Sequence, residues 1–133
     1  RVTVAHQQAR ALTKVYLTRN AVSDIQAIYD YSIATWNESV AESYLSDIES
    51  ALQRCAENPG LLLSKPFLHP ALRFYVVRKH LLVCDVTENA VIVLTVSDSR
   101  MDLAEKLEFL QPTLFAEIDL LRRRAKKISD ELK

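Results

Sequence analysis

The chain has 133 residues, the size of one domain with one ordinary hydrophobic core. Lys plus Arg and Asp plus Glu number 17 each, so the formal net charge is zero. This balance argues against a broad nucleic-acid binder, which normally carries a basic surface. No apolar run reaches the roughly 18 residues of a membrane span, and no signal-peptide pattern opens the sequence. We therefore expect a cytoplasmic protein that does not enter a membrane.

Cofactor and metal sites have little support in the composition. A single glycine excludes a phosphate-binding glycine loop, and no Ser, His and Asp form a hydrolase motif. Cys55 and Cys84 lie in apolar surroundings on different predicted elements, which favours buried thiols over a disulfide or metal pair. His6, His69 and His80 are too scattered for a metal site. We expect no cofactor and no metal.

The first part of the chain predicts an arm, a strand and two helices. Residues 1 to 13 form an arm of uncertain order, and from Lys14 an alternation of apolar residues predicts a first strand. Asn20 is a good N-cap residue, and apolar residues then recur at spacings of three and four as far as Trp36. Ser39 and Glu42 have the spacing of a capping box that opens a second helix. Two helices with a short link form an antiparallel hairpin whose apolar face packs on a sheet.

The middle of the chain predicts the sheet. Residues 61 to 71 contain two prolines and read as a loop. Three apolar runs, 72–77, 81–86 and 91–96, are separated by short polar segments and predict three antiparallel strands linked by hairpins. The third run is apolar at both alternating positions, so we expect a central strand covered by helices. Asn89 is the best substitute for glycine at the second turn.

The last part of the chain predicts two helices. A short helix starts near Leu103 and ends at Pro112, and apolar residues from Leu114 to Leu132 then repeat alternately at four and three. This narrow seam suits packing along one partner, either within the chain or in another molecule.

Taken together, the elements predict an α+β fold: an antiparallel sheet of about four strands, an N-terminal helical hairpin packed on one face, and a C-terminal helix. We divide the chain into the arm at 1–13, a domain at 14–111 and a C-terminal helical extension at 112–133.

Several basic residues are candidates for a functional site. Arg73 begins a strand and either faces a partner or pairs with an acid such as Asp85 on the neighbouring strand. Arg100 follows the central strand, and Lys79 and His80 lie at a predicted turn. The run from Arg122 to Lys127 reads as a solvated helix face or as a binding surface for an acidic partner or nucleic acid; the sequence leaves both open.

A set of spaced residues, covering roughly 15 to 103, resembles the ParE branch of the RelE/ParE toxins. The residues that carry the resemblance are Ala21 to Ile33, Trp36, Ala41 to Leu45, Glu57 to Pro59, Leu72-Arg73, Lys79 to Val83 and Ser99 to Asp102. Family members often carry an aromatic and a basic residue where this chain has Cys84-Asp85, and His-Gly where it has Asp98-Ser99.

The resemblance implies the toxin of a bacterial type II toxin–antitoxin system, with a cognate antitoxin as partner. ParE relatives act on DNA gyrase, and RelE relatives cut messenger RNA on the ribosome. Our leading hypothesis is a non-enzymatic gyrase inhibitor, and the alternative is a ribosome-dependent endonuclease. A third hypothesis is a toxin fold that serves only as an interaction module. The C-terminal helix is a further surface for homo- or hetero-oligomer formation.

The site residues that we expect depend on these hypotheses. For a gyrase inhibitor there is no catalytic set, and the target or antitoxin contacts are Arg73, Lys79, Arg100 and the triplet Arg122, Arg123 and Arg124. For a nuclease, Arg73, His80 and Arg100 would supply cations and a proton carrier. Against the nuclease, no Tyr or His follows His80 in the sequence.

Overall fold

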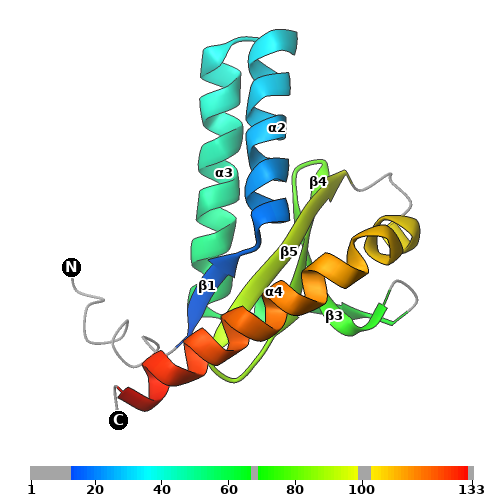
Figure 1. Cartoon of the computed structure of the whole chain (residues 1–133). Coiled ribbons are helices and arrows are strands. Elements are labelled where there is room, and N and C mark those ends of the chain that lie inside the picture. The colour runs from blue at the N-terminus through cyan, green and yellow to red at the C-terminus, as the bar shows by residue number, and fades with distance from the viewer. Residues whose placement is uncertain (1–12, 67–68, 99–102, 132–133) are drawn as a thin grey trace, which may run out of the picture.

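The computed structural model describes residues 13–66, 69–98 and 103–131, with side chains of the last helix from residue 116 on except Ser129 (Figure 1). The elements are β1 (Lys14–Leu17), α2 (Arg19–Thr35), α3 (Glu38–Glu57), the 3-10 turn η1 (Pro59–Leu61), β2 (Leu63–Lys65), β3 (His69–Val77), β4 (His80–Val86), β5 (Ala90–Asp98) and α4 (Leu103–Glu131). The predicted arm at 1–13 lies outside the described residues apart from Thr13.

The sheet has five strands in the order β1-β5-β4-β3-β2. Each neighbouring pair is antiparallel except β1 and β5, which are parallel. The predicted α+β fold is confirmed, and β5 is an interior strand between β1 and β4. The expectation of a wholly antiparallel sheet is wrong for β1, because alternation within a segment identifies a strand and not the neighbour that it joins.

The segment at 61–71 is not only a loop. It contains β2, whose Leu63 lies opposite Phe74, and β3 starts at His69 rather than at Leu72. β2 lies at the edge of the sheet and ends directly before Pro66. A proline at the end of an edge strand removes no hydrogen bond between interior strands, so it is compatible with the sheet. Pairing with β3, rather than local propensity, therefore makes this segment extended.

Both predicted helix starts are wrong in detail. The N-cap of α2 is Thr18, two residues before Asn20, and the N-cap of α3 is Asn37. The Asn37 side chain accepts a hydrogen bond from the Val40 backbone N–H at 2.9 Å, so α3 has no capping box at Ser39. An Asn is as good an N-cap residue as a Ser, and the helix therefore starts two residues earlier than predicted.

A β-bulge interrupts the pairing of β4 and β5. Val83 lies opposite Thr95, whereas the next residue, Cys84, lies opposite Val93. Leu94 is therefore an extra residue in β5, and its backbone groups need partners outside the β4 ladder.

Thr18, the N-cap of α2, supplies a partner for Leu94, and Asp24 binds the backbone two residues further along β5. The Thr18 hydroxyl donates to the Leu94 carbonyl at 2.7 Å and accepts from the Ala21 N–H at 3.0 Å, so one fully buried hydroxyl caps α2 and satisfies the bulge. The Asp24 carboxylate accepts from the Val96 N–H at 3.0 Å. These bonds fix the first two turns of α2 on the central strand.

Replacing Thr18 by Val tests this junction. The change removes the cap of α2, which costs about 1 kcal/mol, and leaves the buried Leu94 carbonyl without its hydroxyl donor, which adds about 1–2 kcal/mol. We expect the free energy of unfolding in urea to fall by about 2–3 kcal/mol. Thr35→Val, at an exposed position at the end of α2, is the matched control and should change it by less than about 0.5 kcal/mol.

The sheet is covered on both faces. The helical hairpin of α2 and α3 packs on one face and projects beyond the sheet, and α4 crosses the other face (Figure 1). Ile118, Leu121 and Ala125 are buried against this second face, so the apolar seam of α4 packs within the chain.

α4 runs without interruption from Leu103 to Glu131, so the helix end predicted at Pro112 is wrong. A proline inside a helix costs about 3 kcal/mol, a penalty that the packing of a long helix on a sheet offsets. The boundary that we placed between 111 and 112 falls inside this helix; the division into domains stays a prediction.

Cys55 on α3 and Cys84 on β4 are free thiols in the core beneath the hairpin, as expected. Burial raises the pKa of both thiols above their ordinary value of 9.0.

No described helix has the length and apolar content needed to cross a membrane. Within the described residues, no group of three or more His, Cys, Asp or Glu side chains is placed to hold a metal ion.

The two thiols predict a pH dependence of stability. The pKa values of both thiols are higher in the folded protein than in the unfolded chain. Above about pH 9 the unfolded chain therefore releases thiol protons that the folded protein keeps. The stability that the buried thiols contribute is thus fully present below about pH 9 and is lost as the pH rises further. We expect the urea midpoint to fall above about pH 9, and to fall less steeply in the Cys84→Ala variant.

A disulfide reagent at about pH 8 should label Cys55 and Cys84 only in denaturant; rapid labelling of both in the native protein would contradict their burial.

Candidate functional site

A groove of about 540 Å³ runs between the helical hairpin and the turn that joins β3 to β4. We call it the hairpin groove. Its lining residues are Ala27, Ile28, Tyr31, Ser32 and Trp36 from α2 and its end, Val40 and Tyr44 from α3, and Arg78, Lys79, His80 and Asp98 from the turn and the strands beside it. Helix residues form an apolar and aromatic wall, and the turn forms a charged one.

The charged wall depends on an unusual backbone at Arg78. In a two-residue hairpin connection, the first residue of the turn adopts a positive φ, which is 52° at Arg78. A side chain in this conformation costs roughly 1–2 kcal/mol. Among the described residues no other non-glycine residue has a positive φ, so the expectation that Asn89 would replace glycine at the second turn is wrong. There, the Thr87 hydroxyl accepts from the Ala90 N–H at 3.0 Å and closes the turn.

The Arg78 side chain ties this turn to α3. Its guanidinium donates to the Asp47 carboxylate and, at 3.0 Å, to the Ser43 hydroxyl. The same group lies 4.8 Å from the centre of the Tyr44 ring, within the range of a cation–π contact. These contacts hold a strained turn against the helix and aim Lys79 at the groove.

Tyr44 and His80 are in contact with each other beside the charged residues of the turn. The Tyr44 hydroxyl and His80 Nδ1 share a hydrogen bond, and the two rings meet edge to face with centres 5.4 Å apart. The backbone N–H of Lys79 donates to the same hydroxyl at 3.4 Å. Burial raises the pKa of Tyr44, against the opposing effects of the Lys79 N–H and the Arg78 charge. The phenol therefore stays neutral at physiological pH and holds the turn as a hydrogen-bonding group.

Two variants at position 78 separate backbone strain from side-chain contacts. Arg78→Ala and Arg78→Gly lose the same contacts to α3, but only glycine adopts the positive φ without strain. We expect Arg78→Gly to be more stable than Arg78→Ala by about 1 kcal/mol in urea unfolding. Lys79 has no positive φ, so at that position the alanine variant should be the more stable one. Equal stabilities of the two position-78 variants would contradict the strained turn.

The aromatic wall is open to solvent. Trp36, at the C-terminal end of α2, and Tyr31 are 67% and 68% exposed, although both are large apolar side chains. Large exposed aromatic side chains that line one groove are typical of a binding site. The sequence identified Trp36 only as the end of a helix. Its amphipathic spacing predicted an apolar face, but the spacing does not show that this end of the hairpin projects beyond the sheet that would cover it.

The predicted basic residues do not gather at one place. Lys79 and His80 line the hairpin groove. Arg73 is exposed on β3 opposite Cys84, which lies four residues along β4 from His80, a separation of roughly 13 Å. Arg100 lies outside the described residues. The structure therefore does not bring Arg73 and His80 together as a catalytic pair.

The basic run on α4 has two different sides. Arg122 makes a bidentate ion pair with Asp85 at 2.8 and 2.7 Å, so the pairing proposed between Arg73 and Asp85 is wrong. The fold places a helix over β4, and Asp85 points to that face rather than toward the neighbouring strand residue. Arg123 and Arg124 are exposed, and Arg123 donates to the Asp119 backbone carbonyl at 3.3 Å.

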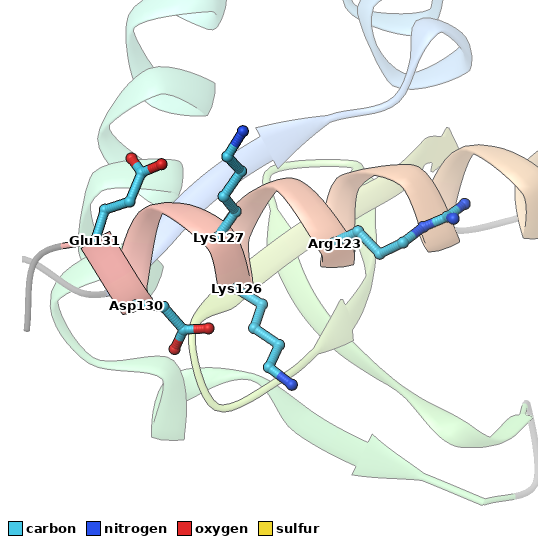
Figure 2. A pocket seen from close by; sticks show the side chains of 5 residues that line it. All are labelled: Arg123, Lys126, Lys127, Asp130 and Glu131. Atoms are coloured by element: carbon cyan, nitrogen blue, oxygen red, sulfur yellow. The ribbon is translucent and has the colours of Figure 1, made fainter.

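An open hollow of about 410 Å³ lies on the outer side of α4. Its lining residues are Arg123, Lys126, Lys127, Asp130 and Glu131, whose side chains extend from one stretch of the helix into solvent (Figure 2). Asp130 and Glu131 follow Lys126 and Lys127 at a spacing of four, which fits a solvated helix face with i to i+4 pairs of opposite charge. The hairpin groove, which has walls from three elements, is the better candidate site.

A strand, a projecting helical hairpin and a meander of antiparallel strands together define a small α+β domain. A solved structure entitled "Chromosomal ParDE TA system from P. aeruginosa" has this fold, with a TM-score of 0.59 at 18% identity over 65% of this chain and 96% of that one. The family model of the ParE toxin of the parDE type II toxin–antitoxin system matches residues 15–103. The chain belongs to this family and is a ParE-type toxin of a type II toxin–antitoxin system.

Curated relatives support the same family. Toxin ParE of Escherichia coli is 27% identical over 97 residues, which cover 72% of this chain and 94% of the relative. Toxin ParE1 of Mycobacterium tuberculosis (strain H37Rv) is 28% identical over 96 residues, which cover 71% of this chain and 98% of the relative. The resemblance to ParE toxins stated from spaced residues is confirmed.

Proposed function

We propose that this toxin inhibits DNA gyrase in the cytoplasm, so that it arrests growth, and that a cognate antitoxin neutralises it. The hairpin groove is the observation that carries this proposal. A gyrase inhibitor must hold a large folded protein, and the groove offers a surface for that task without any covalent chemistry.

The composition of the hairpin groove supports protein binding. Trp, Tyr and Arg are the residues enriched at the energetic centres of interfaces, and the groove contains Trp36, Tyr31 and Arg78. Lys79 is exposed at its rim, where a charge improves the encounter with an acidic partner surface more than the final affinity. The rigid turn at Arg78 gives the groove one shape before the partner arrives, which lowers the entropic cost of binding.

The runner-up function is ribosome-dependent cleavage of messenger RNA. The hydrogen-bonded pair Tyr44 and His80, beside Arg78 and Lys79, favours it, because an imidazole next to cations is a plausible proton carrier for a phosphate reaction. Against it, His80 already uses Nδ1 for Tyr44, and Arg73 lies roughly 13 Å away. The gyrase proposal requires none of these groups to move a proton, so it is the simpler one.

A gyrase supercoiling assay with purified toxin tests the leading proposal. We expect the wild-type protein to inhibit supercoiling and Trp36→Ala to need roughly 30-fold more protein for the same inhibition, the loss typical of a central aromatic contact. Leu120→Ala is the matched control, because Leu120 is also a large apolar side chain, 52% exposed, on the outer side of α4. It should inhibit like the wild type.

A ribosome-dependent RNA cleavage assay on the same preparations separates the two functions. Cleavage by the wild type, lost in His80→Ala, with normal supercoiling would replace the gyrase proposal by the nuclease. If neither activity is present in a folded wild-type protein, the hypothesis of an interaction module without toxicity gains support. Inhibition of gyrase that survives both Trp36→Ala and Tyr31→Ala would retain the function but exclude the hairpin groove as its surface.

A further inference from the structure

The hairpin groove has the size of a small-molecule site. Its volume of about 540 Å³ lies within the range of ligand pockets, roughly 300–1,000 Å³. Its two walls differ in chemistry, because aromatic side chains come from α2 and α3 and cations come from the β3–β4 turn. A small ligand that fills the groove therefore has to suit an aromatic surface on one side and a positive charge on the other.

The aromatic wall is held in place by the link between the two helices. Trp36 lies in this link, and its backbone N–H donates to the Ser32 carbonyl at 2.9 Å, which closes α2. The next residue, Asn37, is the N-cap of α3. The backbone of Trp36 is thus fixed from both sides, while its side chain and that of Tyr31 stay about two-thirds exposed and line the groove. Flat aromatic side chains held open to solvent in this way are suited to stack on the flat ring of a ligand.

The charged wall carries one cation that no acid balances. The Arg78 guanidinium pairs with the Asp47 carboxylate. Asp98, the one acid in the described lining of the groove, lies opposite His80 in the pairing of β4 with β5. Lys79 is exposed, and no other described residue makes an ion pair with its ammonium group. The groove therefore favours an anionic group beside Lys79.

We propose that the hairpin groove binds a purine nucleoside monophosphate, with the base against Trp36 and Tyr31 and the phosphate at Lys79. A purine is a large flat ring that stacks on aromatic side chains, and a lysine ammonium binds phosphate as a point charge. The sugar between base and phosphate lets one molecule reach from the aromatic wall to the charged wall. Because the chain has no phosphate-binding glycine loop, side chains alone hold the phosphate.

The nucleotide site does not depend on gyrase as the target. Only one consequence rests on the proposed function: a nucleotide in the hairpin groove would exclude a protein partner from the same surface. Binding of the nucleotide and inhibition of gyrase are measured separately, so either one can fail without the other.

Trp36 supplies the probe for the test, because it is the only tryptophan in the chain. Adenosine monophosphate is titrated into the full chain, and the fluorescence is excited where adenine does not absorb. We expect saturable quenching with a Kd below about 1 mM. Adenosine has the ring without the anion, and ribose 5-phosphate has the anion without the ring. Each meets one wall only, so each should bind at least about 10-fold more weakly than the nucleotide.

Equilibrium dialysis with radiolabelled adenosine monophosphate compares the variants, because it needs no tryptophan. Trp36→Leu and Lys79→Gln should each weaken binding about 10-fold, and Trp36→Phe should weaken it less because it keeps a ring. Lys127→Gln is the matched control: it removes the same charge from an exposed lysine on the outer side of α4 and should bind like the wild type. Added salt should weaken binding of the nucleotide but not of adenosine.

Three results would overturn the inference. One is the absence of saturable binding to the folded wild type at about 5 mM adenosine monophosphate. The second is binding of adenosine or ribose 5-phosphate that is as tight as binding of the nucleotide, because the two walls would then not act together. The third is an equal loss of binding in Lys79→Gln and Lys127→Gln, because the effect would then come from net charge and not from the groove.

Discussion

The structure depends on the buried hydroxyl of Thr18. Thr18 directly follows β1, and its hydroxyl caps α2 and donates to the carbonyl of Leu94, the extra residue of the bulge in β5. Three elements therefore meet at one side chain. Asp24 completes the junction by accepting from the backbone of Val96. Because the bulge would otherwise leave buried backbone groups unpaired, the central strand and the first helix require each other.

That junction determines where the candidate site lies. With its first turns fixed on β5, the hairpin of α2 and α3 projects beyond the sheet and leaves Tyr31 and Trp36 exposed. The β3–β4 turn then meets the hairpin from the side, and Arg78 and Tyr44 connect the two. The groove is therefore built from elements that are distant in sequence, and the strain at Arg78 is balanced by contacts with α3.

The two faces of the sheet have different roles. One supports the hairpin and its groove, and the other is closed by α4 through an apolar stripe and the Asp85–Arg122 pair. The Asp85 carboxylate is tolerated on this face because an arginine of the helix above it is its bidentate partner. A charged residue in the sheet and a long C-terminal helix belong together in this chain.

The sequence by itself determined the α+β class, the hairpin, the three antiparallel strands and the family, because hydrophobic periodicity and spaced family residues are local properties of the chain. It also predicted that Lys79 and His80 lie at the connection between two strands, since polar residues between two apolar runs mark a turn. Only the tertiary structure decided that β1 is parallel to β5, that Thr18 rather than Asn20 caps α2, that α4 continues through Pro112 and that Asp85 pairs with Arg122. Each of these depends on a partner far away in sequence, and no local pattern records which one the fold supplies.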